Sequence, residues 1–227
     1  MNIELNRISK YYTNPETSIK QHVLTDISLH INAGDSIAII GPSGSGKSTL
    51  LNIIGTLDLP SSGAVFINGM NTSQLTENQL ADFRNKKIGF VFQAHYLLPQ
   101  LNLMENILLP AIPNSDKTKR KLILDRAMYL LAKVGLTDKL RQLPGQLSGG
   151  EAQRGAVVRA LINEPEIILA DEPTGSLDTV ATQQVGDLLS AINQEFKVAV
   201  VVVTHSMYLA NKLNIVYKLE EEKLVRQ

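Results

Sequence analysis

A glycine-rich loop between two apolar segments is the strongest chemical signal in the sequence. The segment GPSGSGKS fits the pattern G-x-x-x-x-G-K-[ST], and it lies between the strand-like run IAII and the helix-like run TLLNII. Such glycines let backbone N–H groups wrap a phosphate, and the positive end of the following helix adds to the attraction. Lys47 would neutralise phosphate charge and Ser48 would reach Mg²⁺. The phosphate-binding candidates are Gly41, Pro42, Ser43, Gly44, Ser45, Gly46, Lys47, Ser48 and Thr49.

Two adjacent acids follow another apolar run. Asp171 and Glu172 end the segment IILADE, and at the carboxyl end of a parallel strand Asp171 would hold Mg²⁺ directly or through water. Glu172 is placed to orient and deprotonate an attacking water. Because this arrangement admits water, it favours hydrolysis over a nucleoside kinase reaction. The sequence contains no N-K-x-D segment that would read guanine, so ATP is the expected nucleotide.

Two more polar residues end apolar runs. His205 follows VAVVVVT, and Gln93 follows IGFVF. Each would ordinarily be a solvated strand end. Parallel strands bring their carboxyl ends to one edge of a sheet, so these residues are expected beside the phosphate loop and the acids. His205 would then lie within reach of a γ-phosphate.

The segment GQLSGGEAQRGAVVRA indicates a second place for an anion. Ser148, Gly149 and Gly150 leave backbone N–H groups uncovered at the start of an apolar helix. Ser148 is also a plain helix N-cap, with Glu151 completing a capping box. The capping box does not account for two consecutive glycines, which weaken a helix. Both interpretations stand together.

The pattern of apolar residues predicts the elements that position these groups. Short unbroken β-branched runs at Ser36–Ile40, Ile88–Phe92, Ile167–Ala170 and Val198–Val203 predict buried parallel strands. Helical patterns at Lys47–Ile54, Ser148–Ile162 and Val180–Phe196 lie between them. Alternating residues at Ile3–Tyr11 and Val23–Ile31 predict half-exposed antiparallel strands.

The predicted fold class is α/β, with a P-loop NTPase core, a mainly parallel sheet, an N-terminal antiparallel β subdomain and an inserted α-helical subdomain. Residues 1–93 and 155–227 form the nucleotide-binding core. Residues 94–154, which have helical periodicity and several prolines, form the helical lobe. The charged run Asp116–Lys121 is expected to be a solvated helix start.

Bulk composition excludes several classes of protein. The 227 residues contain 22 basic and 22 acidic side chains, so no overall positive charge indicates a nucleic-acid partner. Cysteine is absent, which excludes disulfides and thiol chemistry. The amino-terminal residues are too polar for a signal peptide, and no apolar run approaches the roughly 20 residues of a membrane span. Any role at a membrane is expected to come through a partner.

The chain resembles the nucleotide-binding subunits of ABC transporters over nearly its whole length. The motifs that carry the likeness occur in the family order: the phosphate loop, the Q-loop Gln93, the signature LSGGE, the strand that ends in Asp171 and Glu172, the D-loop Ser176–Asp178 and the switch His205. The resemblance implies that Tyr12 stacks on adenine, although Tyr11 beside it is the alternative. It implies that Gln93 contacts the metal along with Ser48 and Asp171.

The resemblance also implies a head-to-tail homodimer around two ATP molecules and Mg²⁺. Ser148, Gly149, Gly150 and Asp178 would then act on the nucleotide held by the opposite chain. Integral membrane permease subunits are the implied partners, and the implied location is the cytoplasmic side of the membrane. Direct nucleic-acid binding is not expected. The apolar segment Tyr96–Pro110 is a candidate docking groove for the permease, or else an ordinary core of the lobe.

Within the family, the segments LNIIGTLDLPSSG and LADEPTGSLD are similar to lipoprotein-releasing (LolD-type) and macrolide-export (MacB-type) subunits. FtsE-type and antimicrobial-peptide-resistance ATPases share much of the sequence of these segments. A departure is Gly155, in the run AQRGAVVRA, where a glycine costs helix stability. The alternatives to a transport subunit are a soluble ABC-type ATPase acting on nucleic acid or the ribosome, and a regulatory binder of ATP.

Overall fold

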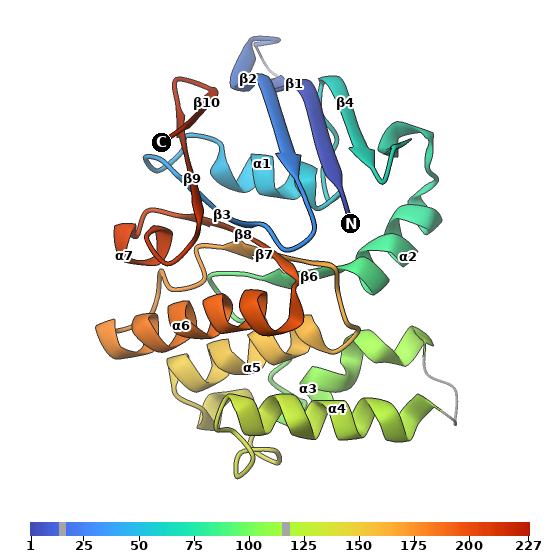
Figure 1. The fold of residues 1–227 in the computed structure, drawn as a ribbon, viewed down its shortest axis with the longest axis vertical. Coiled ribbons are helices and arrows are strands. Elements are labelled where there is room, and N and C mark those ends of the chain that lie inside the picture. The colour runs from blue at the N-terminus through green and yellow to red at the C-terminus, as the bar shows by residue number, and fades with distance from the viewer. Residues whose placement is uncertain (14–16, 115–118) are drawn as a thin grey trace.

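Two sheets with helices packed between and below them build the fold (Figure 1). The computed structural model describes residues 1–13, 17–114 and 119–227. The strands are β1 (Ile3–Thr13), β2 (Lys20–Ile31), β3 (Ser36–Ile40), β4 (Ser62–Ile67), β5 (Met70–Asn71), β6 (Ile88–Val91), β7 (Ile167–Asp171), β8 (Ala199–Thr204), β9 (Ile215–Glu220) and β10 (Lys223–Arg226). The α-helices are α1 (Lys47–Ile54), α2 (Glu77–Lys87), α3 (Leu103–Leu108), α4 (Lys119–Lys133), α5 (Gly149–Leu161), α6 (Thr179–Phe196) and α7 (Met207–Ala210). Short 3₁₀ helices occur at η1 (Thr72–Gln74), η2 (Leu109–Asn114) and η3 (Pro144–Gln146).

The larger sheet has the strand order β10-β9-β3-β8-β7-β6. Strands β9, β3, β8, β7 and β6 run parallel, and only β10 is antiparallel to its neighbour. The smaller sheet is antiparallel, with the order β2-β1-β4-β5. The predicted fold class is thus confirmed, with a mainly parallel core sheet and an antiparallel sheet at the amino-terminal end.

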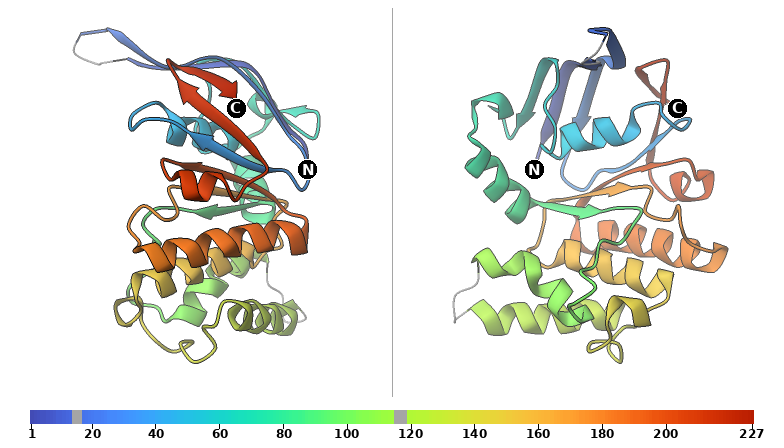
Figure 2. Two further views of the ribbon diagram at one scale, coloured as in Figure 1. Left: turned by 60° about the vertical axis from the view of Figure 1, so that its left-hand side comes forward. Right: turned by 180° about the vertical axis from the view of Figure 1, so that it is seen from behind.

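The central strands are buried on both faces because helices or the other sheet cover each face. Ile37 and Ile39 of β3 face a core with α1 and the antiparallel sheet, whereas Ala38 faces the helices α5 and α6. Figure 2 shows from two further sides that the larger sheet lies between α1 and these two helices. Double-sided burial is the reason that these strands are continuous apolar runs rather than alternating ones.

The helical lobe lies below the sheet and is built from α3, η2, α4 and η3 (Figure 1). In the described part of residues 94–147 there is no strand, as predicted. Of the charged run Asp116–Lys121, residues 116–118 lie outside the described residues, and α4 begins at Lys119. Helix α5 runs without a break from Gly149 to Leu161, so the lobe and the core share one helix across residue 154.

Strand β6 and helix α5 approach each other closely at Gly89. A Cβ atom at this position would lie 2.5 Å from the carbonyl oxygen of Ala160, so only glycine fits without separating the two elements. The approach matters for the site because β6 leads to Gln93 and α5 begins beside Ser148.

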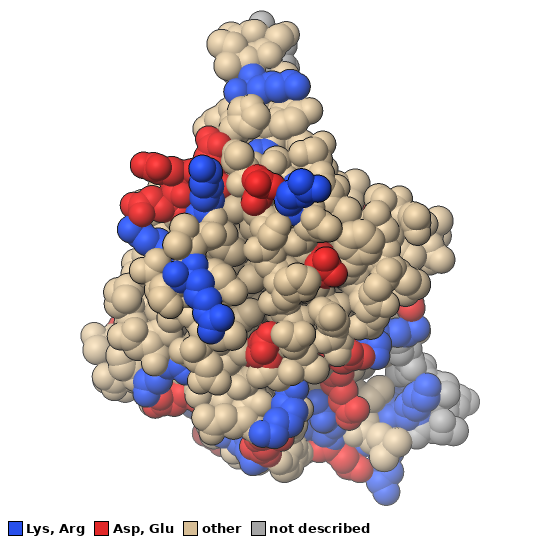
Figure 3. Space-filling model, turned by 45° about the horizontal axis from the view of Figure 1, so that its top comes forward, with Lys and Arg blue, Asp and Glu red and all other residues tan. Residues whose placement is uncertain are grey.

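Several elements were missed by the sequence patterns: α2, β4, β5, the hairpin of β9 and β10, and the short helix α7. In the described residues no helix is long and apolar enough to cross a membrane. On the face shown in Figure 3, basic and acidic side chains are interspersed, which fits the equal numbers of the two in the chain.

Candidate functional site

The glycine-rich loop connects β3 to α1, as predicted. Gly44 and Gly46 have φ values of +77° and +99°, a region that side-chain-bearing residues rarely adopt. At Gly46 a Cβ atom would also lie 2.7 Å from Val23 Cγ1 of β2. The two glycines therefore let the chain wind tightly from the end of the strand into the first turn of α1.

Lys47 lies inside this loop. Its side chain is 6% exposed, and its Nζ donates hydrogen bonds to the carbonyl oxygens of Gly41 and Pro42, both at 2.9 Å. Within the described residues, no carboxylate lies within ion-pair distance of this ammonium group. Ser45 Oγ is buried there without a hydrogen-bond partner among the described groups. A buried cation that is held by carbonyl oxygens, with no carboxylate in direct contact, is a favourable position for a phosphate anion.

Two of the three predicted metal ligands, Ser48 and Asp171, lie together. Ser48 Oγ donates a hydrogen bond of 3.0 Å to Asp171 Oδ1, at the carboxyl end of β7. The described residues contain no group of three His, Cys, Asp or Glu side chains that could hold a metal ion. A hydroxyl and one carboxylate fit Mg²⁺, which keeps several waters and takes its remaining oxygens from a bound phosphate.

Burial raises the pKa of the Asp171 carboxyl above its ordinary value. The hydrogen bond from Ser48 offsets part of this shift, whereas the charge of Glu172 adds to it. Ionisation of the Asp171 carboxyl in the folded protein therefore costs free energy when no cation is bound. The position of this side chain favours cation binding but lowers the free energy of unfolding.

Replacing Asp171 with asparagine is expected to raise the melting temperature of the nucleotide-free protein at pH 7 to 8. The folded-state pKa lies above the unfolded value, so ionisation of Asp171 destabilises the fold at higher pH. That cost disappears as the pH falls through the folded-state pKa. Thermal unfolding at pH 8 and pH 4 checks this, because the advantage of Asp171→Asn should vanish at the lower pH. A variant that is less stable at pH 8 would contradict the prediction.

Glu172 is held in place by its neighbours on β8. Its backbone N–H donates to Val203 O at 2.9 Å, and its φ of +44° lies in the left-handed region. The carboxylate oxygen Oε2 accepts hydrogen bonds from Thr204 Oγ1 at 3.1 Å and from the His205 backbone N–H at 3.2 Å. His205 Nδ1 lies 3.0 Å from the same oxygen. A strained backbone with a fully oriented side chain is typical of functional sites.

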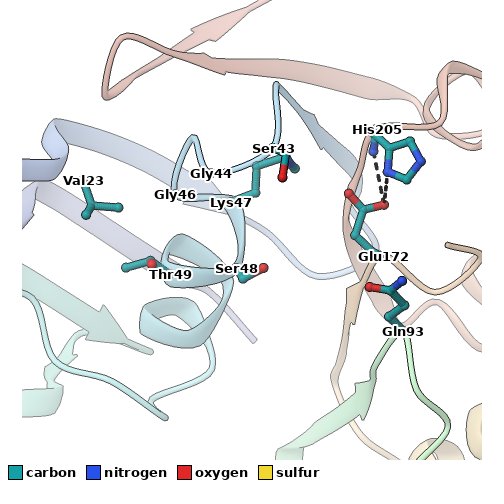
Figure 4. Close-up of a pocket in the computed structure, with 10 residues that line it drawn as sticks. All are labelled: Val23, Ser43, Gly44, Gly46, Lys47, Ser48, Thr49, Gln93, Glu172 and His205. Carbon is teal, nitrogen blue, oxygen red and sulfur yellow. Dashed lines mark hydrogen bonds and ion pairs between the residues drawn. The ribbon is translucent and has the colours of Figure 1, made fainter.

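A cavity of about 550 Å³ brings the predicted groups together (Figure 4). Nine of its ten lining residues were predicted from the sequence, and the tenth is Val23. The phosphate loop forms one side, while Glu172, His205 and Gln93 form the other. The lining residues are Val23, Ser43, Gly44, Gly46, Lys47, Ser48, Thr49, Gln93, Glu172 and His205.

The second candidate anion site, at Ser148, Gly149 and Gly150, does not line this cavity. Ser148 Oγ accepts from the Glu151 N–H at 3.2 Å, and Glu151 Oε2 accepts from the Ser148 N–H at 2.7 Å. The predicted capping box is thereby confirmed. A Cβ atom at Gly150 would lie 2.9 Å from Ala181 Cβ of α6, so close packing of two helices gives one reason for this glycine. Asp178 caps α6 by accepting from the Ala181 N–H at 2.8 Å.

The two tyrosines lie outside the cavity lining. Tyr12 is 46% exposed, and its hydroxyl donates to Asp58 Oδ2 at 3.1 Å, with Lys10 Nζ 5.0 Å from the ring centre. Tyr11 packs against His22. Both rings lie near the loop end of the antiparallel sheet, and the choice between them as the adenine platform stays a prediction.

Besides Val23, two residues of the site escaped the sequence patterns. Thr204, which is fully buried, orients Glu172; threonine at the end of a β-branched strand gives no separate signal. Gln153 is 2% exposed and donates from Nε2 to Phe92 O at 2.8 Å, beside Gln93. Its place on the buried face of α5 is the only hint in the sequence.

Comparisons with known proteins agree with this geometry. A family model described as ABC transporter matches residues 24–175. The lipoprotein-releasing system ATP-binding protein LolD 1 of Rhodopirellula baltica is 44% identical over 223 residues, which cover 98% of this chain and 96% of that protein. The macrolide export ATP-binding/permease protein MacB of Aggregatibacter actinomycetemcomitans is 44% identical over 98% of this chain but only 34% of its own length.

Solved structures show the same likeness. The dimeric structure of MJ0796, a bacterial ABC transporter cassette, has a TM-score of 0.87 and 40% identity, covering 98% of this chain and 96% of that one. A post-hydrolysis state of that cassette, bound to ADP and Pi, has a TM-score of 0.86 and 39% identity over the same shares. The resemblance carried by the ordered motifs is confirmed: the chain belongs to the ABC transporter family and is similar to the ATP-binding subunits of its lipoprotein-releasing and macrolide-export systems.

Proposed function

We propose that this chain is the ATP-hydrolysing subunit of a membrane transporter and works as a pair of identical chains around two MgATP. The observation that carries the proposal is the position of Glu172. Its carboxylate is held by Thr204 and His205 across the cavity from the phosphate loop (Figure 4). A water between that carboxylate and a bound γ-phosphate is where general-base catalysis requires it.

Each part of the cavity has a role in this proposal. Lys47 and the loop N–H groups bind the phosphates, and Ser48 and Asp171 hold Mg²⁺ together with Gln93. The metal ion supplies neutralisation of the charge on the phosphate oxygens. Glu172 accepts a proton from water, while the exposed ring of His205 lies beside it and contacts the γ-phosphate.

The homodimer is proposed because the phosphate loop and the signature of one chain lie apart. The larger sheet lies between α1, which begins at the phosphate loop, and α5, which begins at the signature LSGGE (Figures 1 and 2). A chain's own Ser148 is therefore separated from its own loop. Two copies related head to tail would place the start of α5, where Ser148 and Gly149 are exposed and Gly150 lies buried behind them, on the partner's γ-phosphate. The solved cassette with 40% identity is described as dimeric, which supports the same arrangement.

The proposed docking surface for the permease extends beyond the exposed part of the segment Tyr96–Pro110. Leu97, Leu103 and Ile107 of that segment are buried in the lobe core, whereas Tyr96 and Leu98 are 64% and 41% exposed. A groove of about 390 Å³ lies beside it, between the lobe and α2. Apolar side chains and two arginines line it, among them Leu57, Arg84, Phe90, Phe92, Pro110 and Arg159.

This groove fits a short apolar segment from the cytoplasmic side of a permease. Phe92 connects it to the ATP cavity, because the next residue is Gln93. The subgroup likeness supports lipoprotein release or macrolide export as the transport function, with the protein at the cytoplasmic face of the membrane through its permease.

To test the partner, the tagged chain is captured from detergent-solubilised membranes. We expect a permease to co-purify with the wild-type chain. Leu57→Arg should reduce this capture at least several-fold, because Leu57 is 49% exposed in the groove. The matched control Leu122→Arg changes a 69% exposed leucine of α4 and should retain the permease. Co-purification of ribosomal RNA or DNA without a permease would instead support an ATPase that acts on nucleic acid.

A further inference from the structure

Three backbone carbonyls around Gln93 are held by side chains of a single helix. Gln153 Nε2 donates to Phe92 O at 2.8 Å. Arg159 donates from Nη2 to His95 O at 2.7 Å and from Nη1 to Tyr96 O at 2.6 Å. Both donors belong to α5. The segment 92–96, which carries Gln93, is thus attached to α5 at its first residue and at its last two.

Packing attaches the continuation of this segment to the same helix. Leu103, at the start of α3, is fully buried, and a Cβ atom at Gly155 would lie 2.7 Å from its Cδ1 atom. Gly155 therefore leaves the space that Leu103 fills. Packing of Leu103 at this position offsets the loss of helix stability caused by an interior glycine. Residues 153–159 span only about 9 Å along the helix axis, so the three attachments lie close together.

The two side chains suit this role chemically. Gln153 is 2% exposed, so its loss would remove a hydrogen bond to Phe92 O whose donor is shielded from water. The planar guanidinium of Arg159 reaches two successive carbonyls at once, which the single ammonium group of a lysine does poorly. Tyr96 has a φ of +47°, a conformation that a tyrosine rarely adopts. The bond from Arg159 to its carbonyl stabilises that turn.

We propose that Gln153 and Arg159 are positioning residues that make Gln93 move together with helix α5 and its N-cap Ser148. This inference rests on the proposed function, in which Gln93 contacts the metal in one site and Ser148 contacts the nucleotide of the partner chain. A shift of Gln93 then changes the angle at which α5 presents Ser148. Neither positioning residue touches the nucleotide.

The experiment uses the Glu172→Gln background, in which bound ATP persists, and measures the ATP concentration needed for half-maximal dimerisation by size exclusion. Arg159→Met and Gln153→Met should each raise that concentration about tenfold, and they should speed amide hydrogen exchange at residues 93–97. Arg159→Lys should fall between Arg159→Met and the parent. Gln153→Met nearly preserves side-chain volume, so it carries the test if Arg159→Met does not fold.

A double-mutant cycle separates positioning from general damage. If Arg159 acts through Gln93, adding Arg159→Met to Gln93→Ala should weaken dimerisation no further. The control Arg126→Met removes an arginine that donates to Leu161 O at 2.9 Å, at the far end of α5. It should leave dimerisation within about twofold of the parent.

Two results would overturn the inference while leaving the proposed function intact. One is parent-like dimerisation of both Arg159→Met and Gln153→Met, and the other is full additivity of Arg159→Met with Gln93→Ala. If Gln93→Ala alone has no effect, the role of Gln93 in the proposed function fails and the inference fails with it. Comparison of the three single variants shows which of the two has failed.

Discussion

Replacing Glu172 with glutamine is expected to lower ATP turnover by roughly 10²–10⁴-fold, because glutamine cannot accept the proton of the attacking water. The fold should be unaffected. The amide oxygen of glutamine still accepts the hydrogen bonds that Thr204 Oγ1 and the His205 N–H donate to Glu172. With hydrolysis blocked and ATP binding intact, ATP-loaded dimers should accumulate. Phosphate release measures turnover, and light scattering after size exclusion measures the dimer.

A matched glutamate elsewhere provides the control for this result. Glu164 also has a left-handed backbone, with a φ of +54°, and its side chain is exposed beside Arg126. Glu164→Gln should hydrolyse ATP at close to the parent rate. Near-normal turnover in Glu172→Gln would remove Glu172 from its role as the base. Lost turnover without any ATP-dependent dimer would support Glu172 as the base and refute the proposed ATP-bound homodimer.

The residues proposed to contact phosphate were predictable because local sequence determines the conformation of their loop. The loop needs glycines at positive φ, a lysine and a hydroxyl in fixed order, and the strand and helix around it are continuous apolar runs. Likewise, parallel strands bring Gln93, Glu172 and His205 to one edge of the sheet wherever the loops between them go. These constraints do not depend on distant packing.

The elements that were missed depend on less local information. Strands β9 and β10 are joined through Glu221 and Glu222 at φ values of +49° and +63°, whereas asparagine and glycine are the usual signal for such a turn. The turn between β4 and β5 does carry that signal, as Asn68-Gly69. From the sequence alone, Gly155 is only a cost to the stability of its helix. Its benefit, the space for Leu103, becomes visible only when α3 is folded onto α5.

Mixing two inactive variants is expected to restore ATP hydrolysis, because each site in the proposed dimer draws on both chains. Lys47→Ala removes the cation of the phosphate loop, and Ser148→Arg blocks the signature. Each variant alone should be inactive, since both of its sites carry the defect. In a heterodimer, the intact loop of the Ser148→Arg chain meets the intact signature of the Lys47→Ala chain. An equal mixture should reach about a quarter of the wild-type rate if the two sites work independently.

The arrangement of the same two changes within one chain provides the decisive control. A Lys47→Ala/Ser148→Arg double variant mixed with wild type forms heterodimers in which neither site is intact, so adding it in excess should inhibit the wild-type chain. If each chain instead used its own signature, the wild-type chain would stay active in that mixture and the first mixture would stay inactive. The contrast between the two mixtures depends only on which chain supplies each half of the site.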